Sequence, residues 1–177
     1  MFLDLEEYSD FLLNTCFLNE PDPVGKWLEM EEMQSRIADI LNTKSKIRFV
    51  GEKTDVTFST VGRKWISCSG KNNFPDGEIF TSPVEDSANG TVFFDLPAIY
   101  RGNEVNNIQI TLKDGKVIEA KAEKNEEFLQ KMLNLDEGSS FVGEIAIGTN
   151  TNVTRVTGDI LLDEKIVGGI FYRLYGK

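Results

Sequence analysis

The chain has 177 residues, 40% of them hydrophobic, which suits one domain with a sizeable core. Its formal net charge of −10 argues against binding to nucleic-acid phosphates or anionic lipids, and no apolar run approaches the roughly 18 residues that a membrane span needs. The absence of histidine excludes serine–histidine and cysteine–histidine nucleophile pairs within these residues and removes the commonest transition-metal ligand.

The N-terminal 43 residues predict two helices. Asp4 can cap a helix from Leu5 to Cys16, and Asp22 followed by Pro23 can begin a second helix. In that second segment, apolar residues recur at helical spacing and form one broad face. They are Trp27, Met30, Met33, Ile37, Ile40 and Leu41. We expect this face to pack against the core or against a neighbouring domain.

From Lys46 onward the apolar residues alternate with the two-residue period of strands, and Asp114-Gly115 between two such runs predicts a hairpin. Strands are expected at residues 46–50, 55–61, 64–68, 78–81, 91–95, 105–111, 117–122 and 141–147. A further helix is predicted over 125–135 and a short helical turn near 159–164. The predicted fold class is α+β. N-terminal helices (1–43) precede a mixed, largely antiparallel β-sheet body (46–177) with one further long helix, in a single domain over residues 1–177.

Two glutamates are candidate ligands. Glu78 follows the turn signature Pro75-Asp76-Gly77 at the mouth of a predicted strand, where a rigid backbone can aim its carboxylate. The alternative for Glu78 is an ordinary solvated carboxylate at a strand start. Glu144 precedes an apolar run in a strand predicted to be buried, so it needs a partner. That partner can be a basic side chain, a backbone donor or a metal ion.

Two other groups are expected to have no catalytic role. The segment Asp163-Glu164-Lys165 predicts either a solvated helix edge or an internal salt bridge. Cys68 lies on a predicted strand, and no histidine is present to activate its thiol, so we expect it to be inert.

Taken together, these segments resemble the aminopeptidase T and aminopeptidase S family of metallopeptidases along nearly the whole chain. The motifs that carry the resemblance lie at residues 22–24 with Trp27, 54–58, 62–65, 75–86, 97–101, 114–117, 119–123, 143–150 and 162–166. The family releases N-terminal residues from peptides with a pair of divalent metal ions held by two glutamates, two histidines and an aspartate. The resemblance maps the glutamates onto Glu78 and Glu144, names zinc, cobalt or manganese as the metals, and implies a homodimer.

The sequence departs from the family pattern at its C-terminal end. The family's first histidine corresponds to Phe171 when aligned from Lys165, or to Tyr172 when aligned on the glycine pair 168–169. The remaining histidine and aspartate would lie beyond residue 177. We therefore expect an internal portion of a longer metalloaminopeptidase, as a truncated gene, a frameshifted gene or a reduced homologue. Zinc sites need more ligands, with nitrogen or sulfur among them, so metal binding by the chain alone is expected to be weak or absent.

Two alternatives to an inactive aminopeptidase-family domain stay open at this point. The chain can be a non-catalytic interaction and oligomerisation module, or a partner chain can supply the missing histidines and aspartate. The N-terminus lacks the positive start of a signal peptide and cysteine use is low, so a cytoplasmic location is expected.

Overall fold

The structure, a computed structural model, describes residues 4–174, and it describes side chains as far as Gly169. The chain divides into two compact units. Unit 1 comprises Met1–Thr43, Trp65–Phe80 and Ala146–Phe171, and unit 2 comprises Lys44–Lys64, Thr81–Ile145 and Tyr172–Lys177. The single domain expected over residues 1–177 stays a prediction. Among the described residues, no helix has both the length and the apolar character to cross a membrane.

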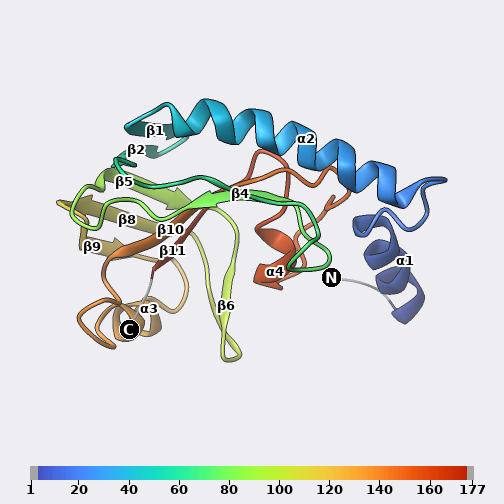
Figure 1. Cartoon of the computed structure of the whole chain (residues 1–177). Helices are drawn as coiled ribbons and strands as arrows, with labels where there is room; N and C mark the ends of the chain where they lie inside the picture. The colour runs from blue at the N-terminus through green and yellow to red at the C-terminus, as the bar shows by residue number, and fades with distance from the viewer. Residues whose placement is uncertain (1–3, 175–177) are drawn as a thin grey trace. The chain divides into compact units, whose positions relative to one another are not determined.

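Unit 1 begins with two helices, α1 (Leu5–Thr15) and α2 (Pro23–Asn42), shown in blue in Figure 1. Both begin where the sequence predicts. The Asp4 carboxylate accepts a hydrogen bond from a backbone amide of the first turn of α1, and the Asp22 carboxylate does the same for α2, each at 2.9 Å. These bonds satisfy amide groups that have no partner inside the helix.

The inner face of α2 is more polar than its apolar spacing predicts. Met30 is buried as expected, but Ile40 is 61% exposed and the polar Gln34 is fully buried. The Gln34 side-chain amide donates hydrogen bonds to the Cys68 carbonyl at 2.9 Å and to the Thr149 hydroxyl at 2.8 Å. Because a buried amide needs partners, Gln34 fixes α2 to the segments of unit 1 that carry Cys68 and Thr149.

A four-stranded sheet carries the segment that contains Glu78. Its order is β11 (Ile170–Leu174), β10 (Val142–Gly148), β4 (Glu78–Thr81) and β3 (Ile66–Cys68). Strands β3 and β4 are antiparallel, and their register places Cys68 opposite Glu78. The short helix α4 (Ile160–Asp163) adds Leu162 to a small buried core in unit 1. The other members of that core are Phe11 and Val153, with Leu12 and Ile166 packed against them.

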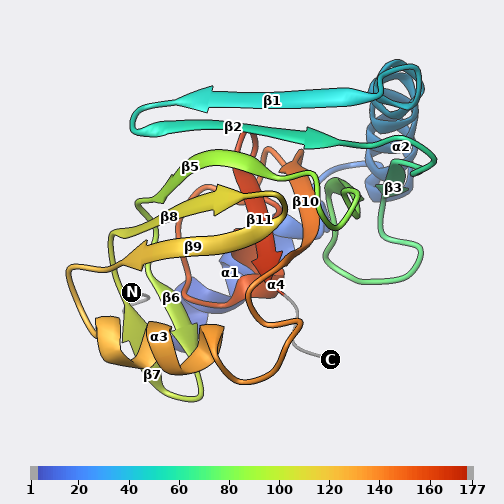
Figure 2. The ribbon, with the colours of Figure 1, turned by 90° about the vertical axis from the view of Figure 1, so that its left-hand side faces the viewer.

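Unit 2 is built on a five-stranded antiparallel sheet in the order β1-β2-β5-β8-β9, seen side by side in Figure 2. Its strands are β1 (Lys46–Gly51), β2 (Thr54–Ser59), β5 (Asn89–Phe94), β8 (Ile108–Lys113) and β9 (Lys116–Lys121). The expected alternation buries one face, including Ile47, Phe49, Val56, Phe58, Val92, Ile110 and Leu112. At the predicted hairpin, Asp114 and Gly115 have φ of +48° and +81°, as a two-residue turn of this kind requires.

Two elements of unit 2 differ in extent from their predictions. The strand expected over 105–111 is divided into β7 (Asn103–Val105) and β8, because Asn107 has a φ of +51° and interrupts the extended chain. Strand β7 pairs instead with β6 (Ala98–Tyr100). The helix expected over 125–135 is the shorter α3 (Glu126–Leu133), since Asn125 at its start has a left-handed backbone.

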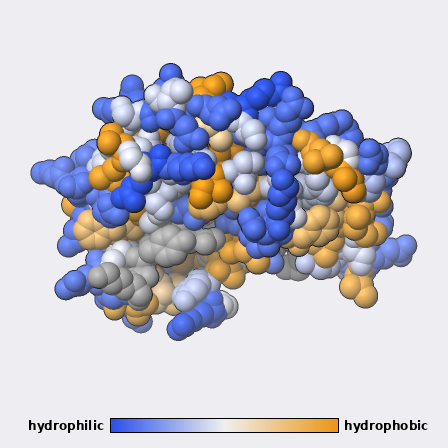
Figure 3. Space-filling model, in the orientation of Figure 1, coloured by the Kyte–Doolittle hydropathy of each residue, from blue (hydrophilic) through white to orange (hydrophobic). Residues whose placement is uncertain are grey.

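Helix α3 packs on β9, and its Gln130 side chain donates to the Ala120 carbonyl at 2.7 Å. The helices and the mainly antiparallel sheets together confirm the α+β class. On the face shown in Figure 3, hydrophilic residues surround separate apolar patches. This surface agrees with the strongly acidic composition of the chain.

Candidate metal site

Glu78 is the first residue of β4 and is delivered by the predicted turn. Gly77 before it has a φ of +127°, a conformation that side-chain-bearing residues rarely adopt, and this glycine lets the chain turn sharply into the strand. Glu78 is only 6% exposed. The alternative of an ordinary solvated carboxylate therefore does not describe Glu78, and a buried carboxylate requires compensation.

The turn before Glu78 is held by the Thr149-Asn150 pair. The Asn150 side-chain amide donates to the Asp76 carbonyl at 2.9 Å and to the Thr15 carbonyl at 3.0 Å. The backbone amide of Thr149 donates to the Gly77 carbonyl at 2.8 Å. Asn150 is fully buried, so these bonds form without competition from water. The motif around Asn150 thus fixes the backbone that carries Glu78.

Replacing Asn150 by alanine is expected to lower the free energy of unfolding by about 2 kcal/mol, because two buried carbonyls lose their donor. Urea denaturation followed by circular dichroism measures the change. Asn152 is the matched control, since its more exposed side chain donates one hydrogen bond, to the Asn14 carbonyl. An Asn152→Ala variant as destabilised as Asn150→Ala would show that burial of the Asn150 amide has no special role.

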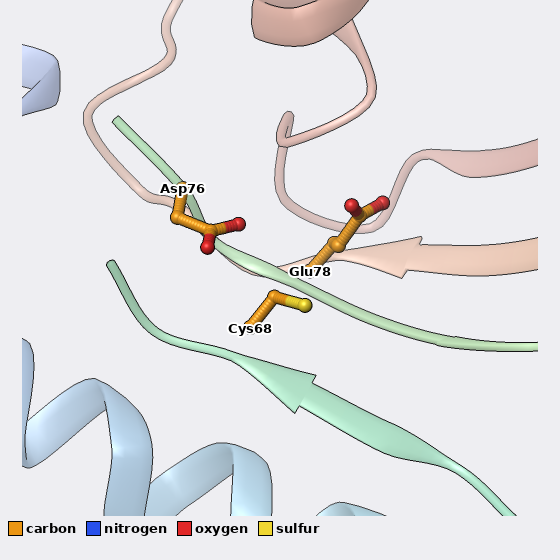
Figure 4. Close-up of side chains that lie close together, drawn as sticks. All are labelled: Cys68, Asp76 and Glu78. Atoms are coloured by element: carbon orange, nitrogen blue, oxygen red, sulfur yellow. The ribbon is translucent and has the colours of Figure 1, made fainter. Parts of the chain in front are cut away.

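Three potential ligand atoms come together at the start of β4. The Cys68 sulfur and one carboxylate oxygen each from Asp76 and Glu78 all lie within 4.8 Å of one another (Figure 4). Asp76 precedes β4, Glu78 is the first residue of that strand, and the positive-φ Gly77 lies between them. Asp76 is fully buried and Cys68 is 9% exposed. Carboxylate oxygens suit hard divalent cations, and a thiolate adds affinity for zinc.

A lysine ammonium already contacts these carboxylates. Lys165 is 1% exposed, and its Nζ donates to Glu78 Oε1 at 2.6 Å and to Glu164 Oε1 at 2.5 Å. The same nitrogen lies 3.9 Å from Asp76 Oδ1. Burial lowers the pKa of the Lys165 amine, but hydrogen bonds to Glu164 and Glu78 outweigh this effect and raise its pKa above the ordinary value. Of the two readings of segment 163–165, the internal salt bridge is therefore the correct one.

Asp163 has a different role from its neighbours. Its carboxylate accepts hydrogen bonds from the backbone amide of Thr157 at 2.7 Å, the Thr157 hydroxyl at 2.8 Å and the backbone amide of Gly158 at 2.9 Å. These three bonds close the loop that leads into α4. Asp163 thus stabilises the conformation of this loop, and its carboxylate oxygens accept their hydrogen bonds from the loop.

Glu144 lies on β10, in the part of that strand that belongs to unit 2, and it is half-buried. Its role as a metal ligand stays a prediction, as does that of Glu78. The two positions aligned with the family histidine, Phe171 and Tyr172, have side chains outside the described residues.

Sequence reasoning missed two residues that the structure brings to Glu78. The sequence predicts Asp76 only as part of the turn before β4, and its position two residues before Glu78 is the signal that could indicate a shared site. For Lys165 the sequence indicates a role only within residues 163–165. No local signal in the sequence indicates its pairing with Glu78, 87 residues away.

The chain is similar in sequence to a family of metalloproteases. Residues 3–170 match the model of the thermophilic metalloprotease (M29) family. Aminopeptidase 2 of Geobacillus stearothermophilus is 34% identical over 80% of this chain and 38% of its own length. Aminopeptidase AmpS of Bacillus subtilis is 30% identical over 73% of this chain and 34% of its own length.

The fold is similar to that of wild-type AmpT from Thermus thermophilus, with a TM-score of 0.80 at 24% identity, over 97% of this chain and 47% of AmpT. The chain therefore spans about a third of the two curated relatives and about half of that solved structure.

Proposed function

This chain belongs to the thermophilic metalloprotease (M29) family, and from this premise we propose that its 177 residues contribute two carboxylates, Glu78 and Glu144, to the divalent-metal chemistry of an aminopeptidase. The observation that carries the proposal is the burial of Glu78 in a cluster with Asp76 and Cys68. The substrate class that the family implies is a peptide. Its N-terminal residue would be the one released.

The donor set around Glu78 fits a divalent cation. Two buried carboxylates supply hard oxygen ligands, and the Cys68 thiol is a softer neighbour. A bound metal would supply Lewis-acid polarisation of a peptide carbonyl and an activated water. Within the chain itself, the Asn150 amide holds the turn that delivers Glu78, and burial keeps bulk water from its carboxylate. Zinc, cobalt and manganese are the metals we propose to test.

We further propose that the 177 residues do not release N-terminal residues by themselves. They contain no histidine, so imidazole, the usual nitrogen ligand of such metals and the commonest general base, is not available. The test is hydrolysis of a peptide with a free N-terminus by the purified chain with added zinc, cobalt or manganese. A longer relative such as Aminopeptidase 2 serves as the positive control. We expect no release above the blank. Robust release that Glu144→Ala abolishes would overturn the proposed inactivity.

A second role, as an interaction module, is favoured by the outer surface of α2. Val24, Leu28 and Ile40 are 69%, 57% and 61% exposed, although all three are apolar. Val24 and Leu28 are one helical turn apart and so lie next to each other, and adjacent exposed apolar side chains are a feature of interaction surfaces. A homodimer or a partner chain that carries the remaining ligands would provide such cover. Light scattering tests the homodimer, and a strict monomer at high concentration would exclude it.

A further inference from the structure

We propose that the ammonium group of Lys165 is the resident counter-cation of Glu78, and that a divalent cation has to compete with this ammonium for the Glu78 carboxylate. The inference rests on the proposed role of Glu78 as a metal ligand. Beyond that role, the inference assigns to Lys165 an effect on the affinity of the site for the metal. Four buried residues carry the argument, namely Asp76, Glu78, Glu164 and Lys165.

The first step is the position of the Lys165 nitrogen. It lies 2.6 Å from Glu78 Oε1 and 2.5 Å from Glu164 Oε1, with Asp76 Oδ1 at 3.9 Å. The contacts with Glu78 and Glu164 are short, charge-assisted hydrogen bonds. The ammonium group thus occupies the space beside Glu78 Oε1 that a cation bound to this oxygen would need. The carboxylates are arranged around a cation, and in this chain the cation is the lysine side chain.

The second step is the balance of charge. Three carboxylates, those of Asp76, Glu78 and Glu164, face one ammonium in a buried cluster. Charges in a protein interior are only weakly screened, so a metal ion bound to Glu78 would be repelled strongly by the nearby ammonium. The lysine also holds the Glu78 carboxylate in place, which favours metal binding. The free energy saved by ordering this one side chain is smaller than the repulsion between the metal ion and the ammonium. Removal of the positive charge should therefore strengthen metal binding.

The third step is that the backbone at Lys165 is held independently of its side chain. The Lys165 carbonyl accepts a hydrogen bond from the backbone amide of Asn150 at 2.9 Å, and the backbone amide of Lys165 donates to the Leu162 carbonyl at 3.0 Å. Replacement by methionine keeps these bonds and the unbranched stem of the side chain. The Lys165→Met variant consequently removes the ammonium while the backbone around the carboxylates keeps its supports.

The experiment is a titration of the purified chain with Mn²⁺, followed by the electron paramagnetic resonance signal of free Mn²⁺ and by the melting temperature. We expect Lys165→Met to bind Mn²⁺ at least tenfold more tightly than the wild type and to gain melting temperature on binding. Lys165→Arg keeps the positive charge and should show no gain. Lys26→Met is the matched control, because Lys26 pairs with Glu29 on the exposed surface of the same unit.

The outcomes separate this inference from the proposed function. Equal or weaker Mn²⁺ binding by folded Lys165→Met would overturn the inference. If Lys165→Met is unfolded without metal, refolding on addition of Mn²⁺ supports it, and failure to refold overturns it. The proposed metal-ligand role of Glu78 is tested separately by the double variant Lys165→Met/Glu78→Gln. If the double variant binds as tightly as Lys165→Met, the proposed role of Glu78 fails.

Discussion

Replacement of Gly77 by alanine is expected to lower the free energy of unfolding by about 3–5 kcal/mol, since it combines backbone strain with a steric clash. Gly77 has a φ of +127°, and a Cβ atom there would lie 2.6 Å from the Asn150 Cβ and 3.2 Å from the Asn150 backbone nitrogen. Asn150 is fully buried and hydrogen-bonded on several sides, so it cannot move away easily. Urea denaturation monitored by circular dichroism measures the loss.

The matched control is Gly168→Ala in the same unit. Gly168 also has a positive φ, +73°, but a Cβ atom added there meets nothing within 4 Å. Its replacement by alanine should lower the free energy of unfolding by about 1–2 kcal/mol, which is the cost of the strained backbone alone. The difference between the two variants isolates the clash with Asn150. Equal losses would mean that the contact between Gly77 and Asn150 does not constrain the turn that carries Glu78.

Lys165→Met in metal-free buffer is expected to destabilise the chain by about 3–5 kcal/mol, the usual cost of breaking a buried ion pair by removing one partner. The variant leaves Glu78, Glu164 and Asp76 without the ammonium that lies among them. The double variant Lys165→Met/Glu78→Gln should recover part of this stability, because one of the carboxylates that face the missing ammonium is then neutral. Denaturation of the wild type, Lys165→Met, Glu78→Gln and the double variant in the presence of a chelator measures all four free energies of unfolding.

Two observations would contradict this expectation. The first is a stability of Lys165→Met close to that of the wild type. The second is a double variant that loses the full sum of the two single losses, since additive losses mean that Lys165 and Glu78 are not coupled. Lys26→Met should leave stability nearly unchanged, because both members of its ion pair are largely exposed.

Features encoded by a few neighbouring residues could be predicted from the sequence. Asp4 and Asp22 begin the first two helices as predicted, and Asp114-Gly115 forms its hairpin. Strand β4 has its predicted bounds, residues 78–81. In each case the signal is local, because a cap or a tight turn is determined by the conformations of a few consecutive residues.

Features that depend on contacts distant in the sequence could not be predicted. The buried Gln34 interrupts an otherwise apolar helix face because it serves Cys68 and Thr149, 34 and 115 residues away. The ion pair between Lys165 and Glu78 likewise joins two segments 87 residues apart, and no sequence motif links them. The candidate site could therefore be located at Glu78 from its motif, but its counter-cation could not be identified.

The central claim is that Glu78 is a metal ligand, and anomalous diffraction from crystals soaked in Mn²⁺ tests it most directly. The account predicts a manganese peak beside the Glu78 carboxylate, of low occupancy in the wild type and higher in Lys165→Met, and no peak there in Glu78→Gln. Manganese peaks confined to other parts of the chain, in both the wild type and Lys165→Met, would contradict the claim.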